Sequence, residues 1–259
     1  MLFRSWYHTL NCGLVPRISG ETDFPCIYGD KVGLGRIYVK LDEGQKLDYD
    51  AWVKGVKEGR SYCGDGLSHV LEFKVDHVDV GEPGDGGKTS TRSLDAPGTV
   101  TVACDVAALL AEPRPTPATE AIRTRRLDEK PYWHLERARQ GDSRSVPVEV
   151  IVNGRPVLTR MLEADGHVEE MAFRVEIAES SWVAVRIFPS VHTNPVWVEV
   201  AGKPVRASRA SAAWCREAVD VCWQAKQGNI RESEREAASA AYDEARAYYD
   251  AVLGEATAE

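Results

Sequence analysis

Two carboxylates in a short polar stretch are the best candidates in this sequence for metal binding or acid/base catalysis. Glu21 and Asp23 follow an apolar approach that ends at Ile18, and Pro25 closes the stretch. A strand that delivers an acid to a loop at its C-terminal end is how an α/β barrel positions a metal ligand or an acid/base group. The pattern therefore predicts a metal or acid/base site at Asp23, with a solvated acidic loop as the alternative.

A second polar cluster lies in the middle of the chain. Residues 132–139 alternate apolar and polar side chains, the period of a strand, and the polar positions include His134, Glu136, Arg137 and Arg139. These side chains could bind a small anionic ligand or form an ionic network inside the protein. We expect the structural network and keep the ligand site as the alternative.

The six histidines do not complete a metal site. None belongs to an H-x-H, H-x-x-x-H or H-E-x-x-H pattern, the spacings that identify zinc sites. His77 lies between Asp76 and Asp79, but neighbours on a strand point to opposite faces, so we expect no shared metal there. The glycine-rich loop 81–89 has Glu82 where a phosphate-binding loop needs its first glycine, so we expect a turn.

Composition excludes several classes of partner. The 259 residues are 43% hydrophobic and 28% charged, with a formal net charge of −8, so no basic excess exists to neutralise nucleic-acid phosphates. No apolar run approaches the ~20 residues that span a bilayer, and the N-terminus lacks the pattern of a signal peptide. We therefore expect no nucleic-acid or membrane partner, a cytoplasmic location, and cysteines that are reduced and mostly buried.

The first element before Asp23 is an expected helix, because residues 1–16 have a helix-like apolar spacing. The apolar face of this segment needs a partner surface. Residues 33–40 alternate as a short strand. A helix follows, with Asp48 as its N-cap, an apolar stripe that includes Trp52, and Gly59 at the position of a left-handed C-terminal cap.

A long run of short strands fills the centre of the chain. From residue 67 to residue 200 the apolar period is two, and the turn signals predict about seven to nine strands. The clearest hairpin joins residues 146–152 to residues 157–161 through Asn153 and Gly154. This pattern favours an antiparallel, immunoglobulin-like β-sandwich. From Ser208 the period returns to 3.6, and Gly228 separates two helices of an expected αα-hairpin.

A set of short motifs lies in order along nearly the whole chain, at residues 6–7, 10–13, 22–25, 35–39, 52, 59–62, 64–66, 149–154, 192–196 and 202–204. Taken together they resemble CehA/McbA-type metallohydrolases of the PHP (polymerase and histidinol phosphatase) superfamily. The motifs up to residue 66 are similar to the end of the family's metal-binding domain, and the later ones to its C-terminal β-domain.

The resemblance implies a metal ligand. In that family a Gly-Thr/Ser-Asp motif supplies a late ligand at the mouth of the barrel, so Asp23 inherits this role and Glu21 replaces the glycine. The family's H-x-H and its further His and Glu ligands precede this segment and have no counterpart in the chain. One carboxylate cannot hold a divalent ion firmly, because a hydrolytic site needs three or more ligands and an open position. We therefore expect zinc or manganese in a full-length parent and no tightly bound metal here.

These expectations combine into a fold class, α+β and mainly β. Residues 1–62 would be the last α/β elements of a PHP-like barrel, 63–207 the β-sandwich and 208–254 the helical hairpin. The chain is then the C-terminal part of a hydrolase that cleaves an ester, amide or phosphoester of a small molecule with a metal-bound hydroxide, and it is inactive alone. Its partner would be a missing N-terminal half, or a second copy that completes the site across an interface. The rival is a non-catalytic binding or assembly module whose sandwich presents the cluster around Arg137 to an anionic ligand, glycan or protein.

Overall fold

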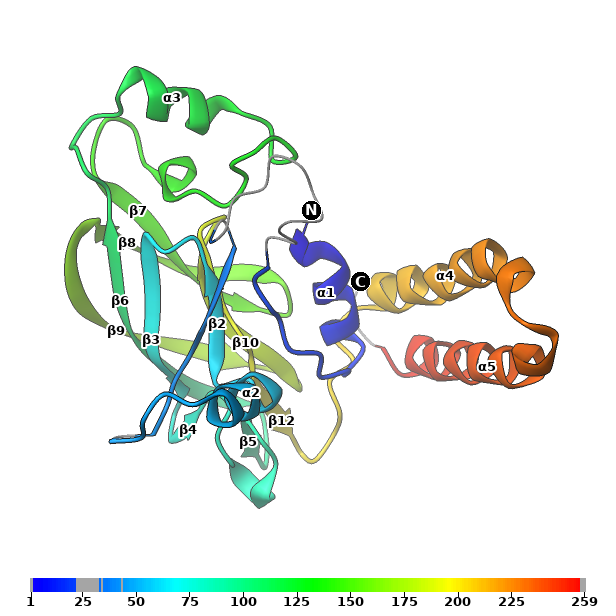
Figure 1. Cartoon of the computed structure of the whole chain (residues 1–259). Helices are drawn as coiled ribbons and strands as arrows, with labels where there is room; N and C mark the ends of the chain where they lie inside the picture. The colour runs from blue at the N-terminus through cyan, green and yellow to red at the C-terminus, as the bar shows by residue number, and fades with distance from the viewer. Residues whose placement is uncertain (1, 22–32, 34, 43, 257–259) are drawn as a thin grey trace. The chain divides into compact units, whose positions relative to one another are not determined.

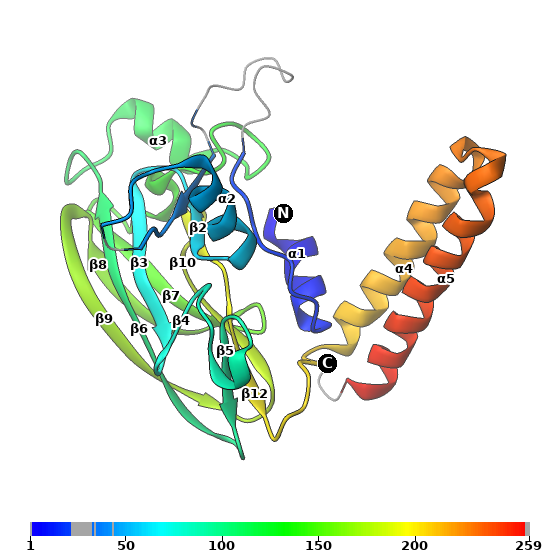
Figure 2. The ribbon, with the colours of Figure 1, turned by 60° about the horizontal axis from the view of Figure 1, so that its bottom comes forward.

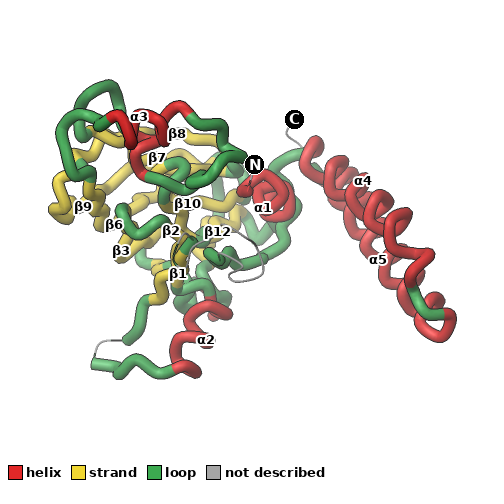
Figure 3. Tube along the Cα trace, turned by 45° about the horizontal axis from the view of Figure 1, so that its top comes forward, coloured by secondary structure: helices red, strands yellow, loops and turns green. Residues whose placement is uncertain are grey.

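The computed structural model describes residues 2–21, 33, 35–42 and 44–256. The chain divides into two compact units. One is continuous and runs over residues 17–202, and it holds all the strands of the described part (Figure 3). The other is discontinuous, because it combines residues 1–16 with residues 203–259, and its described elements are helical.

Along the chain, helices occupy both ends of the described part, and the strands with two further helices lie between them in sequence (Figure 1). The helices are α1 (Leu2–Asn11), α2 (Tyr49–Glu58), α3 (Pro117–Thr124), α4 (Arg209–Lys226) and α5 (Glu232–Glu255), with short 3-10 turns η1 (Asp85–Gly87), η2 (Leu135–Ala138) and η3 (Gln227–Asn229). The strands are β1 (Arg36–Val39), β2 (Ser61–Gly64), β3 (Ser68–Val75), β4 (Val78–Asp79), β5 (Thr91–Leu94), β6 (Gly98–Leu109), β7 (Ser145–Val152), β8 (Arg155–Glu163), β9 (Asp165–Ile177), β10 (Ser181–Ile187), β11 (Val191–Thr193) and β12 (Val196–Val200).

Two sheets build the continuous unit. The larger has eight strands in the order β1-β2-β11-β10-β12-β5, and β7 pairs with both β10 and β8. The smaller has the order β4-β3-β6-β9, and its three longer strands lie side by side in Figure 2. The pairs are antiparallel except β12 with β5, where Trp197 lies opposite Thr91 in a parallel ladder. The expectation of antiparallel sheets is thus confirmed with this one exception.

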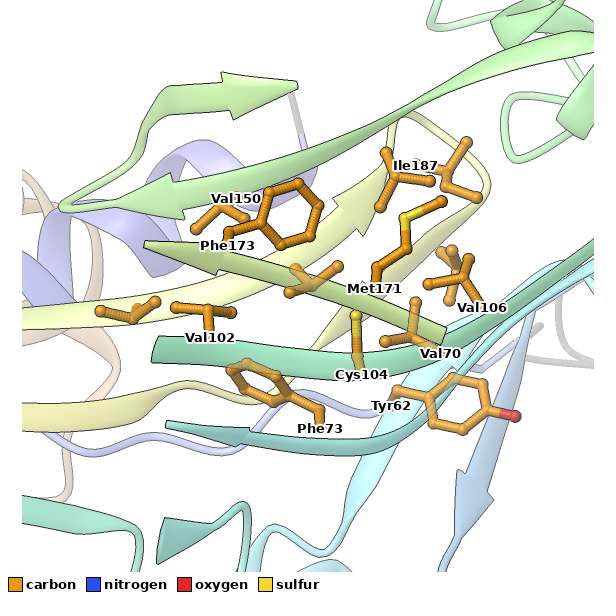
Figure 4. Close-up of a cluster of buried hydrophobic side chains, with 14 of the residues drawn as sticks. Tyr62, Val70, Phe73, Val102, Cys104, Val106, Val150, Met171, Phe173 and Ile187 are labelled. Carbon is orange, nitrogen blue, oxygen red and sulfur yellow. The ribbon is translucent and has the colours of Figure 1, made fainter. Parts of the chain in front are cut away.

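A single hydrophobic core receives side chains from both sheets. Alternation along β6 buries Val100, Val102, Cys104 and Val106 on the core side, as a period of two requires. Strand β10 is buried at nearly every position, because it pairs on both sides within the larger sheet. Figure 4 shows residues of both sheets meeting in this core. Each fully buried Val contributes about 1.5–3 kcal/mol through its removal from water.

Helix α2 begins and ends where the sequence predicts. The Asp48 side chain accepts a hydrogen bond from the Ala51 amide at 3.0 Å, and Gly59 at φ 83° caps the C-terminus. Its apolar stripe is less buried than expected, however, since Tyr49 is 76% exposed. The only buried residue of this helix is Gly55, where a Cβ atom would lie 2.2 Å from Val39 Cγ1. Close approach to β1 thus fixes this helix.

Two segments differ from the sequence prediction. Residues 132–139, which alternate like a strand, contain the 3-10 turn η2, because their side chains pair locally, as described below. Helix α3 was not predicted in the proline-rich region. Its N-cap Thr116 forms a reciprocal capping box with Thr119, and Pro117 fits the first helical turn, where no amide donor is needed.

The discontinuous unit is held by α1, α4 and α5. The Tyr248 hydroxyl donates to the Cys12 carbonyl at 2.8 Å, and the Ser211 hydroxyl accepts from the Asn11 amide group at 3.0 Å. Cys12, Cys215 and Val252 are buried in its small core. The expected hairpin of α4 and α5 is present, but its stripe on α5 is fully buried only at Val252.

The boundaries of the two units differ from those that the sequence indicates. Strands β1 and β2 pair within the larger sheet, so no boundary falls at residue 62. Residues 1–16 belong with the C-terminal helices, because α1 supplies the partner surface that an isolated αα-hairpin lacks. In the part of the chain that the structure describes, no helix combines the length and apolarity needed to cross a membrane.

Candidate functional site

Asp23, the predicted metal ligand, lies outside the described residues, as do its neighbours in the range 22–32. The structure does describe both ends of this loop. Glu21 is exposed at the entry, and Gly35 precedes β1 at the exit. The contacts of these two ends show where the segment is attached to the rest of the fold.

The two ends of the loop meet. A Cβ atom on Gly20 would lie 2.3 Å from the Arg36 carbonyl oxygen, and one on Gly35 would lie 2.8 Å from the Glu21 carbonyl oxygen. Only glycine permits backbones to approach so closely. The loop therefore leaves and returns at one point, at the start of β1.

The approach to the loop is anchored to the larger sheet by Asn194. This side chain is fully buried, its Oδ1 accepts from the Ile18 amide at 3.1 Å, and its Nδ2 donates to the Ser61 carbonyl and hydroxyl oxygens at 3.1 and 2.9 Å. Both N–H donors and one acceptor position of this buried amide thus join the approach, β2 and the end of β11. Asn194 therefore serves as a clamp between these three segments.

A polar and aromatic group stands beside the loop base. Tyr62 and His69 share a hydrogen bond of 2.7 Å between the hydroxyl and Nδ1, and the Tyr38 ring meets the imidazole edge to face at 4.9 Å. Burial lowers the pKa of His69; the Asp65 charge opposes this effect and the Arg36 charge adds to it. His69 is consequently a neutral imidazole at pH 7, able to accept a proton.

Asp65 ties this group to the core. One of its carboxylate oxygens accepts from the Leu67 amide and the Ser190 hydroxyl, both at 2.8 Å, and the other accepts from the Leu135 amide at 2.8 Å. Ser68 and Ser190 are 2.5 Å apart through their hydroxyl oxygens. The carboxylate acts as a junction between three segments that are far apart in the sequence.

The residues of the second predicted cluster lie together around the 3-10 turn η2. Glu136 and Arg139 are 5% and 4% exposed and form a bidentate ion pair, with Nε–Oε2 and Nη2–Oε1 distances of 2.6 and 2.7 Å. The remaining nitrogen of Arg139 donates to three carbonyl oxygens, those of Glu112, Pro113 and Ser143. Four of the five N–H donors of this buried guanidinium are thus used inside the protein, which leaves little for a ligand.

His134 and Arg137 complete the same turn from its surface. His134 caps η2, because its Nδ1 accepts from the Glu136 amide at 3.1 Å. Arg137 donates to the carbonyl oxygens of Ile122 and Arg125. Burial lowers the pKa of Arg137, and the Glu129 charge opposes this effect. The four predicted residues therefore lie together, and their contacts hold α3 against the turn.

Metal-binding capacity is limited in the described part of the chain. Within residues 2–21, 33, 35–42 and 44–256 no group of three or more His, Cys, Asp or Glu side chains is arranged to hold a metal ion. His77 pairs with Asp85 at 2.8 Å, whereas Asp76 accepts from Arg92. His77 and Asp76 thus pair with different residues and do not share a metal site.

Sequence reasoning missed the pairing of Tyr62 with His69 and the role of Asn194. A signal for the first was present: Gly66, at φ 87°, lies in the short link 65–67 between β2 and β3, which carry Tyr62 and His69. The Arg36 guanidinium lies over Gly66, where a Cβ atom would be 1.4 Å from Nη1. No local signal exists for Asn194, since its partners lie 133 and 176 residues away.

Comparison with known proteins gives no match, either to a family model or to a curated protein.

Proposed function

We propose that the protein works as the C-terminal part of a PHP-like metal-dependent hydrolase, and that it lends its acidic loop to a metal site whose other ligands lie outside the chain. The observation that carries this proposal is the anchored loop base: Gly20 and Gly35 bring both ends of the loop to the start of β1, and Asn194 fixes the approach. A ligand contributed by a loop has to be positioned by rigid elements around it.

In this proposal the two sheets are the immunoglobulin-like β-domain of such an enzyme, and the loop is a remnant of its barrel. When bound, the metal ion supplies a hydroxide nucleophile for cleavage of an ester, amide or phosphoester. Asp23 would be the ligand from this chain. The neutral His69, oriented by Tyr62, would stand beside the loop base as a proton acceptor.

The internal hydrogen bonds of the Arg139 guanidinium bear on the rival proposal of a binding module. A site for an anionic ligand at His134, Glu136, Arg137 and Arg139 would require Arg139 to give up internal partners. Breaking a buried ion pair costs about 3–5 kcal/mol. We therefore favour the hydrolase proposal over an anion site at this cluster.

The first test is the reading frame upstream of the Met1 codon. An in-frame H-x-H motif followed by further His and Glu codons is expected, and its absence would overturn the proposal. The longer protein is then expressed with Asp23→Ala and, as a matched control, with Asp95→Ala, an exposed acid on a turn. Asp23→Ala should lower metal content and ester or phosphoester hydrolysis by at least about tenfold, and Asp95→Ala should change neither.

A second measurement uses the present chain alone. Elemental analysis after dialysis against zinc or manganese should find far less than one ion per chain, because one carboxylate is an incomplete ligand set. Tight stoichiometric metal would contradict the proposal that the remaining ligands lie elsewhere. Metal bound only by a dimer, measured by mass spectrometry under native conditions, would instead assign those ligands to a second copy.

A further inference from the structure

A pocket between the two sheets shares Tyr62 with the proposed site, but its other lining residues have no role in the proposed function. It lies between β1 and β2 of the larger sheet and β3 and β4 of the smaller one, and its volume is about 240 Å³. An apolar cavity of about 150 Å³ is large enough for benzene. This pocket therefore has room for a bicyclic ring.

Aromatic and aliphatic side chains form the walls. Tyr38 and Tyr62 stack with ring centroids 5.0 Å apart and an angle of 14° between their planes. Val70 and Phe73 of β3 and Val80, which follows β4, also line the pocket. Tyr62, Val70 and Phe73 can be followed in Figure 4. Such walls select a flat apolar group.

Both cations that line the pocket are already paired. Lys40 Nζ lies 2.5 Å from a carboxylate oxygen of Glu72. Arg60 is 7% exposed. Its guanidinium forms ion pairs with Asp42, Glu58 and Glu82 at 3.0, 3.0 and 3.2 Å. An incoming anion would therefore meet carboxylates before it met a free positive charge.

The charge that remains at the pocket is negative. The Asp79 carboxylate lines it and forms no ion pair with any residue that the structure describes. Burial acts to lower the pKa of Lys40, but the hydrogen bond to Glu72 and the charges of Glu72, Asp79 and Glu82 outweigh burial and raise it. The field at the pocket thus favours cations.

We propose that this pocket binds a small aromatic amine in its cationic form, with the ring against Tyr62 and Phe73 and the ammonium group at Asp79. Electron-rich aromatic faces attract a nearby ammonium group as well. The inference goes beyond the proposed function, since it assigns a ligand to Phe73 and Asp79, which have no part in the proposed metal site.

Isothermal titration with three probes of one ring size tests the proposal: tryptamine, neutral indole and indole-3-acetate. An alkyl ammonium group keeps its proton at pH 7. Tryptamine should bind the whole chain saturably, about tenfold or more tighter than indole, and indole-3-acetate should bind more weakly than either. Equal affinity for the amine and the acid, or no saturable binding of tryptamine at millimolar concentration, would overturn the proposal.

Asp79→Asn locates the binding. The variant should weaken tryptamine about tenfold and leave indole unchanged, whereas Asp95→Asn, which removes an exposed acid outside the pocket, should change neither affinity. If Asp79→Asn leaves tryptamine binding as it is, the amine binds elsewhere and the assignment of this pocket fails.

Discussion

At the scale of single residues, the buried pair of Glu136 and Arg139 is the strongest electrostatic contact described here. Removing one partner leaves a buried charge without its counter-ion, so Glu136→Ala should lower the free energy of unfolding by about 3–5 kcal/mol. Urea unfolding at pH 7 measures this loss. The double variant Glu136→Leu with Arg139→Met should recover only part of it, since the carbonyl oxygens that Arg139 serves then lose their donor.

The matching control uses a pair of the same chemistry on the surface. Arg126 and Asp128 are 76% and 63% exposed and lie 2.6 Å apart. Asp128→Ala should leave the urea midpoint unchanged, because water replaces an exposed partner. A loss below about 1 kcal/mol for Glu136→Ala would show that the pair is solvated in solution and not closed as the structure has it.

His192 makes stability depend on pH. It is fully buried, and burial lowers its pKa to about 3, while its Nδ1 donates to the Thr193 carbonyl at 2.7 Å. In the unfolded chain the same imidazole titrates near pH 6.5. The unfolded state therefore takes up a proton first as the pH falls, so this contribution to stability is constant above about pH 6.5 and decreases from there towards pH 3.

The expected decrease is at most about 1.4 kcal/mol for each pH unit within that window. His192→Gln keeps a donor for Thr193 but has no titrating group, so its free energy of unfolding should fall less steeply between pH 6 and pH 4. The comparison is made by urea unfolding at several pH values. Parallel curves for the two proteins would mean that His192 gains its proton without unfolding.

At the scale of elements, two helical glycines should respond to the same substitution in opposite directions. A Cβ atom on Gly55 of α2 would lie 2.2 Å from Val39 Cγ1, whereas Gly254 of α5 has open space around it. Gly55→Ala should destabilise the protein by about 1–3 kcal/mol through overpacking. Gly254→Ala should stabilise it by about 0.5 kcal/mol through helix propensity. Thermal unfolding measures both, and stabilisation by Gly55→Ala would contradict the close contact with β1.

How much of the fold the sequence predicts depends on the range of the interactions. The caps of α2, at Asp48 and Gly59, and the turn at Asn153 and Gly154, both with positive φ, are local and could be predicted. The parallel pairing of β12 with β5 could not, because its register relates Trp197 to a residue 106 positions earlier. The same holds for the candidate site: the carboxylates of its loop are visible in the sequence, whereas the clamp at Asn194 is set by tertiary contacts alone.

At the scale of the whole molecule, residues 1–16 complete a core that the C-terminal helices cannot close alone. Cys12 and Cys215 are 0% and 3% exposed in that core. A variant without residues 1–16 should therefore expose the Cys215 thiol to a labelling reagent, while Cys63 and Cys104, buried in the two-sheet unit, stay protected. Mass spectrometry of labelled peptides reads out each thiol separately. Continued protection of Cys215 would show that α4 and α5 close without α1.

The discontinuous unit has a mechanical consequence. Its two segments, residues 1–16 and residues 203–259, enclose the two-sheet unit in the sequence. A pulling force applied to α1 and α5 would load the contacts between these helices, such as the bond from Tyr248 to Cys12. The strands would bear tension only after the helices had separated. The helical unit thus shields the anchored acidic loop and the amine pocket from stretching.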